Sequence, residues 1–169
     1  FARERPLTPK TMGVQGAIDE ALALVSHQAK LQDIVIDKDM KAAGMVLADF
    51  GQLRQAFINI IINACDAMAG GGRLGVRTHD GEDTVDIEFT DTGCGVPPQH
   101  LNNILDPFFT TKEKGTGLGL SVVYGIVERH NGQVEIESEV GKGTTVRIRL
   151  PRAADGEPGP SGASAGRTA

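Results

Sequence analysis

The sequence contains no tryptophan, and only 4% of its 169 residues are aromatic, so its core must be built mainly from aliphatic side chains. Its two cysteines, Cys65 and Cys94, lack the spacing of metal ligands or of a disulfide framework, which is typical of a reducing compartment. The sequence also lacks an apolar run of about 18 residues and a signal-peptide pattern. We therefore expect a soluble, cytoplasmic fragment without membrane contact of its own, whose longer parent could still be membrane-anchored.

The sequence also lacks a run of Lys or Arg, and its net charge is −5. This charge balance argues against nucleic acid as a partner. Glycine, in contrast, is abundant, with 22 residues, and 40% of the chain is hydrophobic, which is enough for the core of one domain. The glycines that indicate functional turns gather in two places: Gly93, Gly95, Gly115, Gly117, Gly119, Gly141 and Gly143.

Hydrophobic periodicity divides the chain into three parts. Residues 1–13 are polar and contain two prolines, so we expect a linker or the tail of an upstream segment. Residues 14–151 form the domain, and the Pro/Gly-rich tail 152–169 is expected to be disordered. The patterns predict these elements: helix 14–30, strands 34–37 and 45–48, helix 50–69 with Asp49 and Gln52 as a capping box, strands 73–78 and 84–90, helices 98–105 and 118–130, and strands 133–138 and 144–150.

This order predicts a two-layer α/β (α+β) sandwich, in which helices cover one face of a mixed, mostly antiparallel sheet. Alternating acidic residues predict that the other face is partly wet: Asp86, Glu88, Glu135 and Glu137. The four histidines, namely His27, His79, His100 and His130, have no catalytic partner at a suitable spacing, so we interpret them as surface or capping residues.

A polar stripe interrupts the apolar helix 50–69, because Asn59, Asn63 and Asp66 fall at i, i+4 and i+7 and share one face. Buried amides must be hydrogen-bonded, either by other protein groups or by a ligand. Amide oxygens also suit a hard cation such as Mg²⁺, which usually takes few protein oxygens when phosphates complete its coordination. Taken with the glycine segments, the stripe favours a metal and phosphate role for Asn63.

Asp91 follows a strand and precedes Gly93 and Gly95, which let the backbone pass close to a ligand. A carboxylate can accept a hydrogen bond from the exocyclic amine of adenine, whereas the carbonyl of guanine would be repelled. An Asp-Thr-Gly turn without any ligand is the alternative for this segment taken alone.

The segment KGTGLGLS opens a helix with three glycines, where free amides and the positive end of the dipole attract anions. Lys112 and Lys114 precede it as compact cations that suit a polyphosphate. It matches neither a Walker loop nor the dinucleotide fingerprint. Phe108 and Phe109 belong either to the core or to a mobile lid over the nucleotide.

Five ordered motifs together resemble the catalytic, ATP-binding domain of bacterial sensor histidine kinases, which has the Bergerat fold of the GHKL superfamily. They are NIIINACDAM, DTGCG, DPFFTTK, GTGLGLS and GKGTTVRIRLP, and the resemblance extends from about Val14 to Pro151. The short lid resembles the nitrogen-regulation-like subgroup, and residues 1–13 resemble the linker from the dimerisation helix hairpin that precedes this domain in the family. The resemblance implies catalytic roles for Asn59, Asn63 and Lys112, with Asn63 as the Mg²⁺ ligand. It implies that the nucleotide is bound by Asn63, Asp66, Asp91, Gly93, Gly95, Val96, Phe109, Thr110, Thr111, Lys112, Lys114, Gly115, Thr116, Gly117, Leu118, Gly119, Leu120 and Thr144, the last supporting Asp91 through water.

The resemblance also implies a reaction, the transfer of the ATP γ-phosphoryl to a histidine on the dimerisation domain of the same homodimeric protein, with a response regulator receiver domain as the further partner. No stretch of this sequence matches the acceptor motif H-E-x-x-x-P. Asn59 stands where ATP-hydrolysing relatives of the gyrase type carry a glutamate base, so hydrolysis should be slow. An ATP-binding regulatory module or an anti-sigma-type serine kinase is the alternative.

Overall fold

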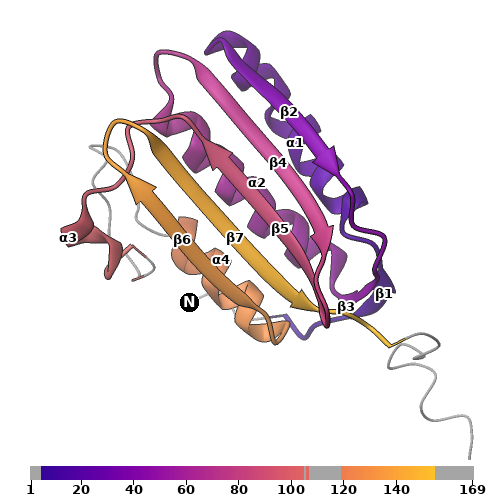
Figure 1. Cartoon of the computed structure of the whole chain (residues 1–169). Coiled ribbons are helices and arrows are strands. Elements are labelled where there is room, and N and C mark those ends of the chain that lie inside the picture. Colours follow the sequence, from indigo (N-terminus) through magenta and orange to yellow (C-terminus); the bar gives the residue numbers. More distant parts are fainter. Residues whose placement is uncertain (1–4, 105, 107–118, 155–169) are drawn as a thin grey trace, which may run out of the picture.

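A five-stranded mixed sheet, covered by helices on one face, organises the chain (Figure 1). A computed structural model describes residues 5–104, 106 and 119–154. The strands lie in the spatial order β2 (Ile34–Met40), β4 (Gly72–Asp80), β5 (Thr84–Asp91), β7 (Gly143–Pro151) and β6 (Gln133–Glu139). β2 and β4 are parallel, whereas the remaining neighbours are antiparallel. The predicted mixed, mostly antiparallel sheet is therefore confirmed.

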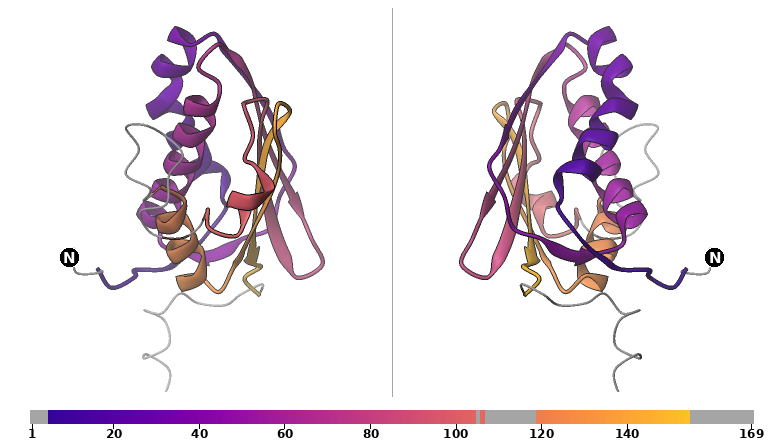
Figure 2. Two further views of the ribbon diagram at one scale, coloured as in Figure 1. Left: turned by 90° about the vertical axis from the view of Figure 1, so that its left-hand side faces the viewer. Right: turned by 90° about the vertical axis from the view of Figure 1, so that its right-hand side faces the viewer.

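The helices α1 (Gln15–Leu31), α2 (Phe50–Ala67) and α4 (Gly119–Arg129) lie together on one side of the sheet, as the two side views in Figure 2 show. α1 buries the residues that its periodicity predicts, namely Ile18, Ala21, Leu22, Val25 and Ala29. Within the described residues, the core is aliphatic apart from the sulfur-containing Cys65 and Met68 and the aromatic Phe57 and Phe89, whose ring centroids lie 5.6 Å apart. The scarcity of aromatic residues therefore predicted the nature of the core correctly.

Two elements differ from their predicted form. Residues Lys10–Met12, expected in a linker, form strand β1, which pairs antiparallel with β3 (Val46–Ala48) in a separate two-stranded sheet. The short helix α3 is restricted to Pro98–Leu101. The tail was predicted to be disordered, and its residues 155–169 lie outside the described part of the chain.

The uncovered face of the sheet carries charged side chains that pair across strands. Arg147 of β7 forms ion pairs with Glu88 (2.6 Å) and Glu135 (3.2 Å). Asp86, which we expected on this wet face, is instead only 8% exposed, because Thr84 Oγ1 and His79 Nε2 contact its carboxylate. The helix-covered face therefore carries the apolar core, whereas this face carries cross-strand ion pairs.

Candidate functional site

The polar face of α2 is accessible rather than buried. Asn59 and Asn63 are half-buried and Asp66 is exposed, while Leu53, Phe57 and Ile61 bury the opposite side of the helix. The helix is thus amphipathic, and the polar stripe that its sequence predicts lies on its more exposed side. Water or a ligand can therefore reach the amides of this stripe.

The first residue of α4 lies directly on these amides. Asn59 Nδ2 donates to the carbonyl oxygen of Gly119 over 3.3 Å, and a Cβ on Gly119 would stand 3.0 Å from Asn63 Nδ2. Asn59 Oδ1 also accepts from Gln55 Nε2 at 2.8 Å, so this amide is used within the protein. The structure therefore brings together the stripe and the start of the glycine-opened helix, two features far apart in sequence.

Asp91 ends β5 opposite Thr144 of β7, and it is only 8% exposed. Its Oδ1 accepts from two backbone amides, Gly93 N at 2.8 Å and Thr144 N at 3.3 Å. No group in the described part of the chain donates to Oδ2. Burial raises the pKa of Asp91, and the two hydrogen bonds offset this only in part. One oxygen of this buried carboxyl is thus fixed by two backbone amides.

The turn after Asp91 packs against the end of α2. Cys94 N donates to the carbonyl oxygen of Ala67 at 3.1 Å, and a Cβ on Gly93 would lie 2.7 Å from the Ala67 Cβ. Gly93 is therefore required by a close approach of two segments. This packing places the Asp91 turn and the polar stripe of α2 at the same end of the helix layer.

Thr144 contacts Asp91 through its main chain, and the water-mediated support that the resemblance implied stays a prediction. Its backbone N–H donates directly to Asp91, whereas its Oγ1 lies 2.7 Å from Ser138 Oγ in β6. Ser138 Oγ also accepts from Val96 N at 2.7 Å. Our sequence reasoning missed Ser138, whose only signal is its position opposite Thr144 in the final hairpin.

The remaining predicted ligands fall into two groups. Leu120 of α4 is partly buried against the core. The other group, with the short lid and Phe108, lies outside the described residues: Phe109, Thr110, Thr111, Lys112, Lys114, Gly115, Thr116, Gly117 and Leu118.

The described residues contain no group of three or more His, Cys, Asp or Glu side chains that could hold a metal ion. A single amide oxygen such as that of Asn63 fits only a cation that a ligand's own oxygens and water also coordinate, as is usual for Mg²⁺. Cys65 is buried and Cys94 is exposed, and both are free thiols. None of the helices within the described ranges combines the length and apolarity that a membrane crossing needs.

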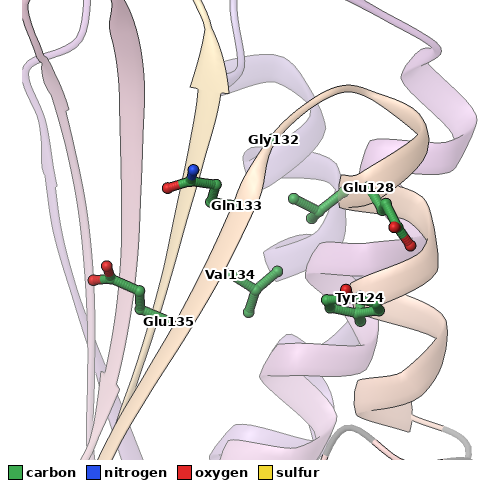
Figure 3. Close-up of a pocket in the computed structure, with 7 residues that line it drawn as sticks. Tyr124, Glu128, Gly132, Gln133, Val134 and Glu135 are labelled. Atoms are coloured by element: carbon green, nitrogen blue, oxygen red, sulfur yellow. The ribbon is translucent and has the colours of Figure 1, made fainter.

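A separate groove of about 320 Å³ lies between α4 and β6 (Figure 3). Val134 points from β6 toward Tyr124 of α4, while Gln133 and Glu135 point to the other side of the sheet. None of the predicted ligands lines this groove. The candidate site is therefore the Asp91 turn with the polar face of α2, and not this groove.

A family model matches more than half of the chain, and curated proteins have similar sequences. Residues 48–154 match the family of histidine kinase-, DNA gyrase B-, and HSP90-like ATPases. Sporulation kinase C of Bacillus subtilis is 38% identical over 92% of this chain, and sensor kinase CckA of Brucella abortus is 39% identical over 90%. This chain spans only 37% and 18% of these two relatives.

Solved structures agree with the sequence relatives. The catalytic domain of histidine kinase ThkA, in a nucleotide-free form, has a TM-score of 0.78 and 27% identity, covering 85% of this chain and 95% of its own. Full-length ShkA in complex with AMPPNP has a TM-score of 0.80 and 27% identity, covering 90% of this chain and 33% of its own. By the family match over residues 48–154 and by the fold, the chain belongs to the histidine kinase-, DNA gyrase B-, and HSP90-like ATPase family.

Proposed function

We propose that this chain binds ATP with Mg²⁺ and is the catalytic domain of a sensor histidine kinase. The observation that carries this proposal is Asp91, a buried carboxyl with one oxygen fixed by two backbone amides. Support comes from the relatives, which are named sporulation and sensor kinases, and from ShkA, which was solved with an ATP analogue.

Asp91 would select the base. Its Oδ2 would accept a hydrogen bond from the exocyclic amine of adenine, and this contact favours the charged carboxylate that burial disfavours. The carbonyl that guanine presents at the same position would be repelled by the carboxylate. Gly93 and Gly95 shape the turn beside the base, because a Cβ on Gly93 would lie 2.7 Å from the Ala67 Cβ and one on Gly95 would lie 2.2 Å from the carbonyl oxygen of Glu139.

The phosphates would lie toward α2 and the start of α4. Asn63, which meets Gly119, would hold Mg²⁺ through its amide oxygen, with Asp66 nearby on the same face. The ion, when bound with ATP, would neutralise phosphate charge. The expected phosphate contacts of the segment 110–118, with Lys112 and Lys114, belong to this same proposal.

The reaction breaks the bond between the γ-phosphorus and the bridging oxygen of ATP and forms a phosphorus–nitrogen bond with a histidine. ADP leaves, and the accepting histidine lies on the dimerisation hairpin of the parent homodimer. Phosphoryl transfer depends mainly on positioning and charge neutralisation, so the domain needs no strong base of its own. Asn59, an amide already bonded to Gly119 and Gln55, cannot act as a general base toward water. A response regulator receiver domain would then take the phosphoryl group.

The test mixes this chain with a separately produced histidine-bearing hairpin domain and ATP labelled at the γ-phosphate. We expect acid-labile label on the hairpin and strongly reduced label with Asp91→Asn, whose amide keeps an oxygen for Gly93 and Thr144 but directs a donor at the adenine amine. Thr145→Val, on the opposite face of β7, is the matched control and should label as the wild type does. Acid-stable label on a serine of a partner would instead indicate the serine-kinase alternative.

A further inference from the structure

The turn that follows Asp91 lies beyond the ladder of β5 and must be held by other contacts. Besides the Cys94–Ala67 bond to α2, it is tied to the final hairpin at two points. Gly141 N donates to the carbonyl oxygen of Cys94 at 2.9 Å, and Val96 N donates to Ser138 Oγ at 2.7 Å. Ser138 therefore supplies the side-chain link between this turn and the β6–β7 hairpin.

The hydroxyl of Ser138 is used to its full capacity. It accepts from Val96 N, it donates to the carbonyl oxygen of Gly143 at 3.0 Å, and Thr144 Oγ1 lies 2.7 Å away. Since the single hydroxyl proton of Ser138 goes to Gly143, Thr144 Oγ1 is the donor in the remaining contact. One side chain thus closes a three-way junction at the half-buried end of β6.

This junction lies between the two segments that hold the Asp91 carboxyl. Thr144, which contacts Ser138 through its side chain, donates its own backbone N–H to Asp91 Oδ1. Gly93, the other donor to Oδ1, lies in the turn whose far end Ser138 holds at Val96. Loss of the Ser138 hydroxyl would leave the amide donors of Gly93 and Thr144 in the chain. It would, however, remove the contacts that fix the turn of Gly93 relative to the hairpin of Thr144.

We propose that Ser138 is a positioning residue for base recognition, which sets the Asp91 carboxyl at the place where it selects adenine. The proposal rests on the proposed function, in which Asp91 binds the base. Ser138 does not touch the nucleotide, and it acts through Val96 and Thr144. Its removal should therefore weaken adenine recognition more than binding of the phosphates.

The experiment measures ADP and GDP affinity of this chain by calorimetry, with Ser138→Ala, Ser138→Thr and the control Thr145→Val. Thr145 Oγ1 makes a comparable hydroxyl contact with Thr90 at 3.1 Å, on the exposed face of the same sheet. Ser138→Ala should lower ADP affinity about three- to tenfold, as expected for loss of one hydrogen bond, and should narrow the preference for ADP over GDP. Ser138→Thr, which keeps the hydroxyl, should restore the preference, and Thr145→Val should leave it unchanged.

Several results would overturn the role of Ser138: wild-type preference in Ser138→Ala, equal losses for ADP and GDP, failure of Ser138→Ala to fold, or loss of the preference in Ser138→Thr. These differ from failure of the proposed function, which would appear as absent ADP binding in the unaltered chain. Wild-type ADP binding therefore has to be shown first. Amide spectra of Gly93 and Thr144 give an independent readout, since both should shift in Ser138→Ala and return in Ser138→Thr.

Discussion

Gly143 shows how closely the final hairpin approaches the site. Its φ is +127°, and a Cβ there would lie 2.0 Å from the carbonyl oxygen of Asp91. Gly141 in the same hairpin also has a positive φ, +81°, but a Cβ on it would meet nothing within 4 Å. Substitution of Gly141 therefore tests the cost of a positive φ alone, whereas substitution of Gly143 adds the cost of a steric collision.

We expect Gly143→Ala to lower the free energy of unfolding by more than about 2 kcal/mol, because the new methyl group must push β7 away from Asp91. Gly141→Ala, which adds only the strain of a positive φ, should cost about 1 kcal/mol. Urea unfolding of both variants measures the difference. An equal decrease in the free energy of unfolding in both variants would show that the collision with Asp91 does not contribute to the destabilisation.

Asp49 joins three parts of the chain at the start of α2. Its Oδ1 accepts from Gln52 N at 3.1 Å, which confirms the predicted N-cap, and its Oδ2 accepts from Thr8 N at 3.0 Å and Thr8 Oγ1 at 3.2 Å. Its own N–H donates to His130 Nε2 at 3.1 Å, where the capping box would have placed the Gln52 side chain. The cap of α2 is thus tied both to the N-terminal segment and to the end of α4.

We expect Asp49→Ala to lower the free energy of unfolding by about 1–2 kcal/mol, because the first turn of α2 loses its acceptor. Asp49→Asn should lose less, since Asn caps Gln52 N equally well and gives up only the bonds from Thr8. Urea unfolding of the two variants at neutral pH compares the contributions. An Asn variant as unstable as the Ala variant would assign the effect to charge rather than to the cap.

The difference in stability between the wild type and Asp49→Asn should depend on pH. Burial would raise the pKa of Asp49, but the hydrogen bonds from Thr8, Gln52 and Gly51 together hold it below the ordinary 3.8. The stability that the charge adds is therefore fully present above pH 3.8 and is lost as pH falls through the folded-state value. The advantage of the wild type over Asp49→Asn should disappear in that acidic range.

The local signals explain which parts of the site could be predicted. Asn63 and Asp91 lie within an amphipathic helix and at the end of an alternating strand, where a short window of sequence shows their placement. Ser138 and His130 carry a weaker signal, because each also has a partner distant in the chain, Val96 for Ser138 and Asp49 for His130. His130, which we interpreted as a surface or capping residue, does cap, but it is only 7% exposed, with Nδ1 2.7 Å from the carbonyl oxygen of Ile126.

Contacts between distant segments also limited how much of the fold could be predicted. The order of helices and hairpins could be predicted, since each follows from periodicity and glycine turns within about twenty residues. β1 could not, because three residues beside two prolines form a strand only through pairing with β3, more than thirty residues away. The segment after β7 in turn contacts the residue before β3, because Ala153 N donates to the carbonyl oxygen of Met45 at 2.7 Å.

Asp80 fastens these distant segments together at the edge of the sandwich. It ends β4, and its carboxylate accepts from Ala43 N and Gly44 N, each at 2.9 Å, and from Arg152 Nη2 at 3.0 Å. The two backbone hydrogen bonds, followed by the contribution of Arg152, lower the pKa of Asp80. Three segments that no local pattern connects, namely 41–45, the β4–β5 hairpin and the end of β7, therefore meet at one side chain.

We expect Asp80→Ala to open this junction without unfolding the core, because the lost acceptor serves only the connection between β2 and β3 and the end of β7. Hydrogen exchange should become faster at Ala43, Gly44 and Ala153, and it should stay slow in β5 and at the centre of β7. Asp83→Ala is the matched control, since Asp83 in the same hairpin contacts Arg152 only through its backbone carbonyl. Faster exchange throughout the sheet in Asp80→Ala would instead make the junction part of the global folding unit.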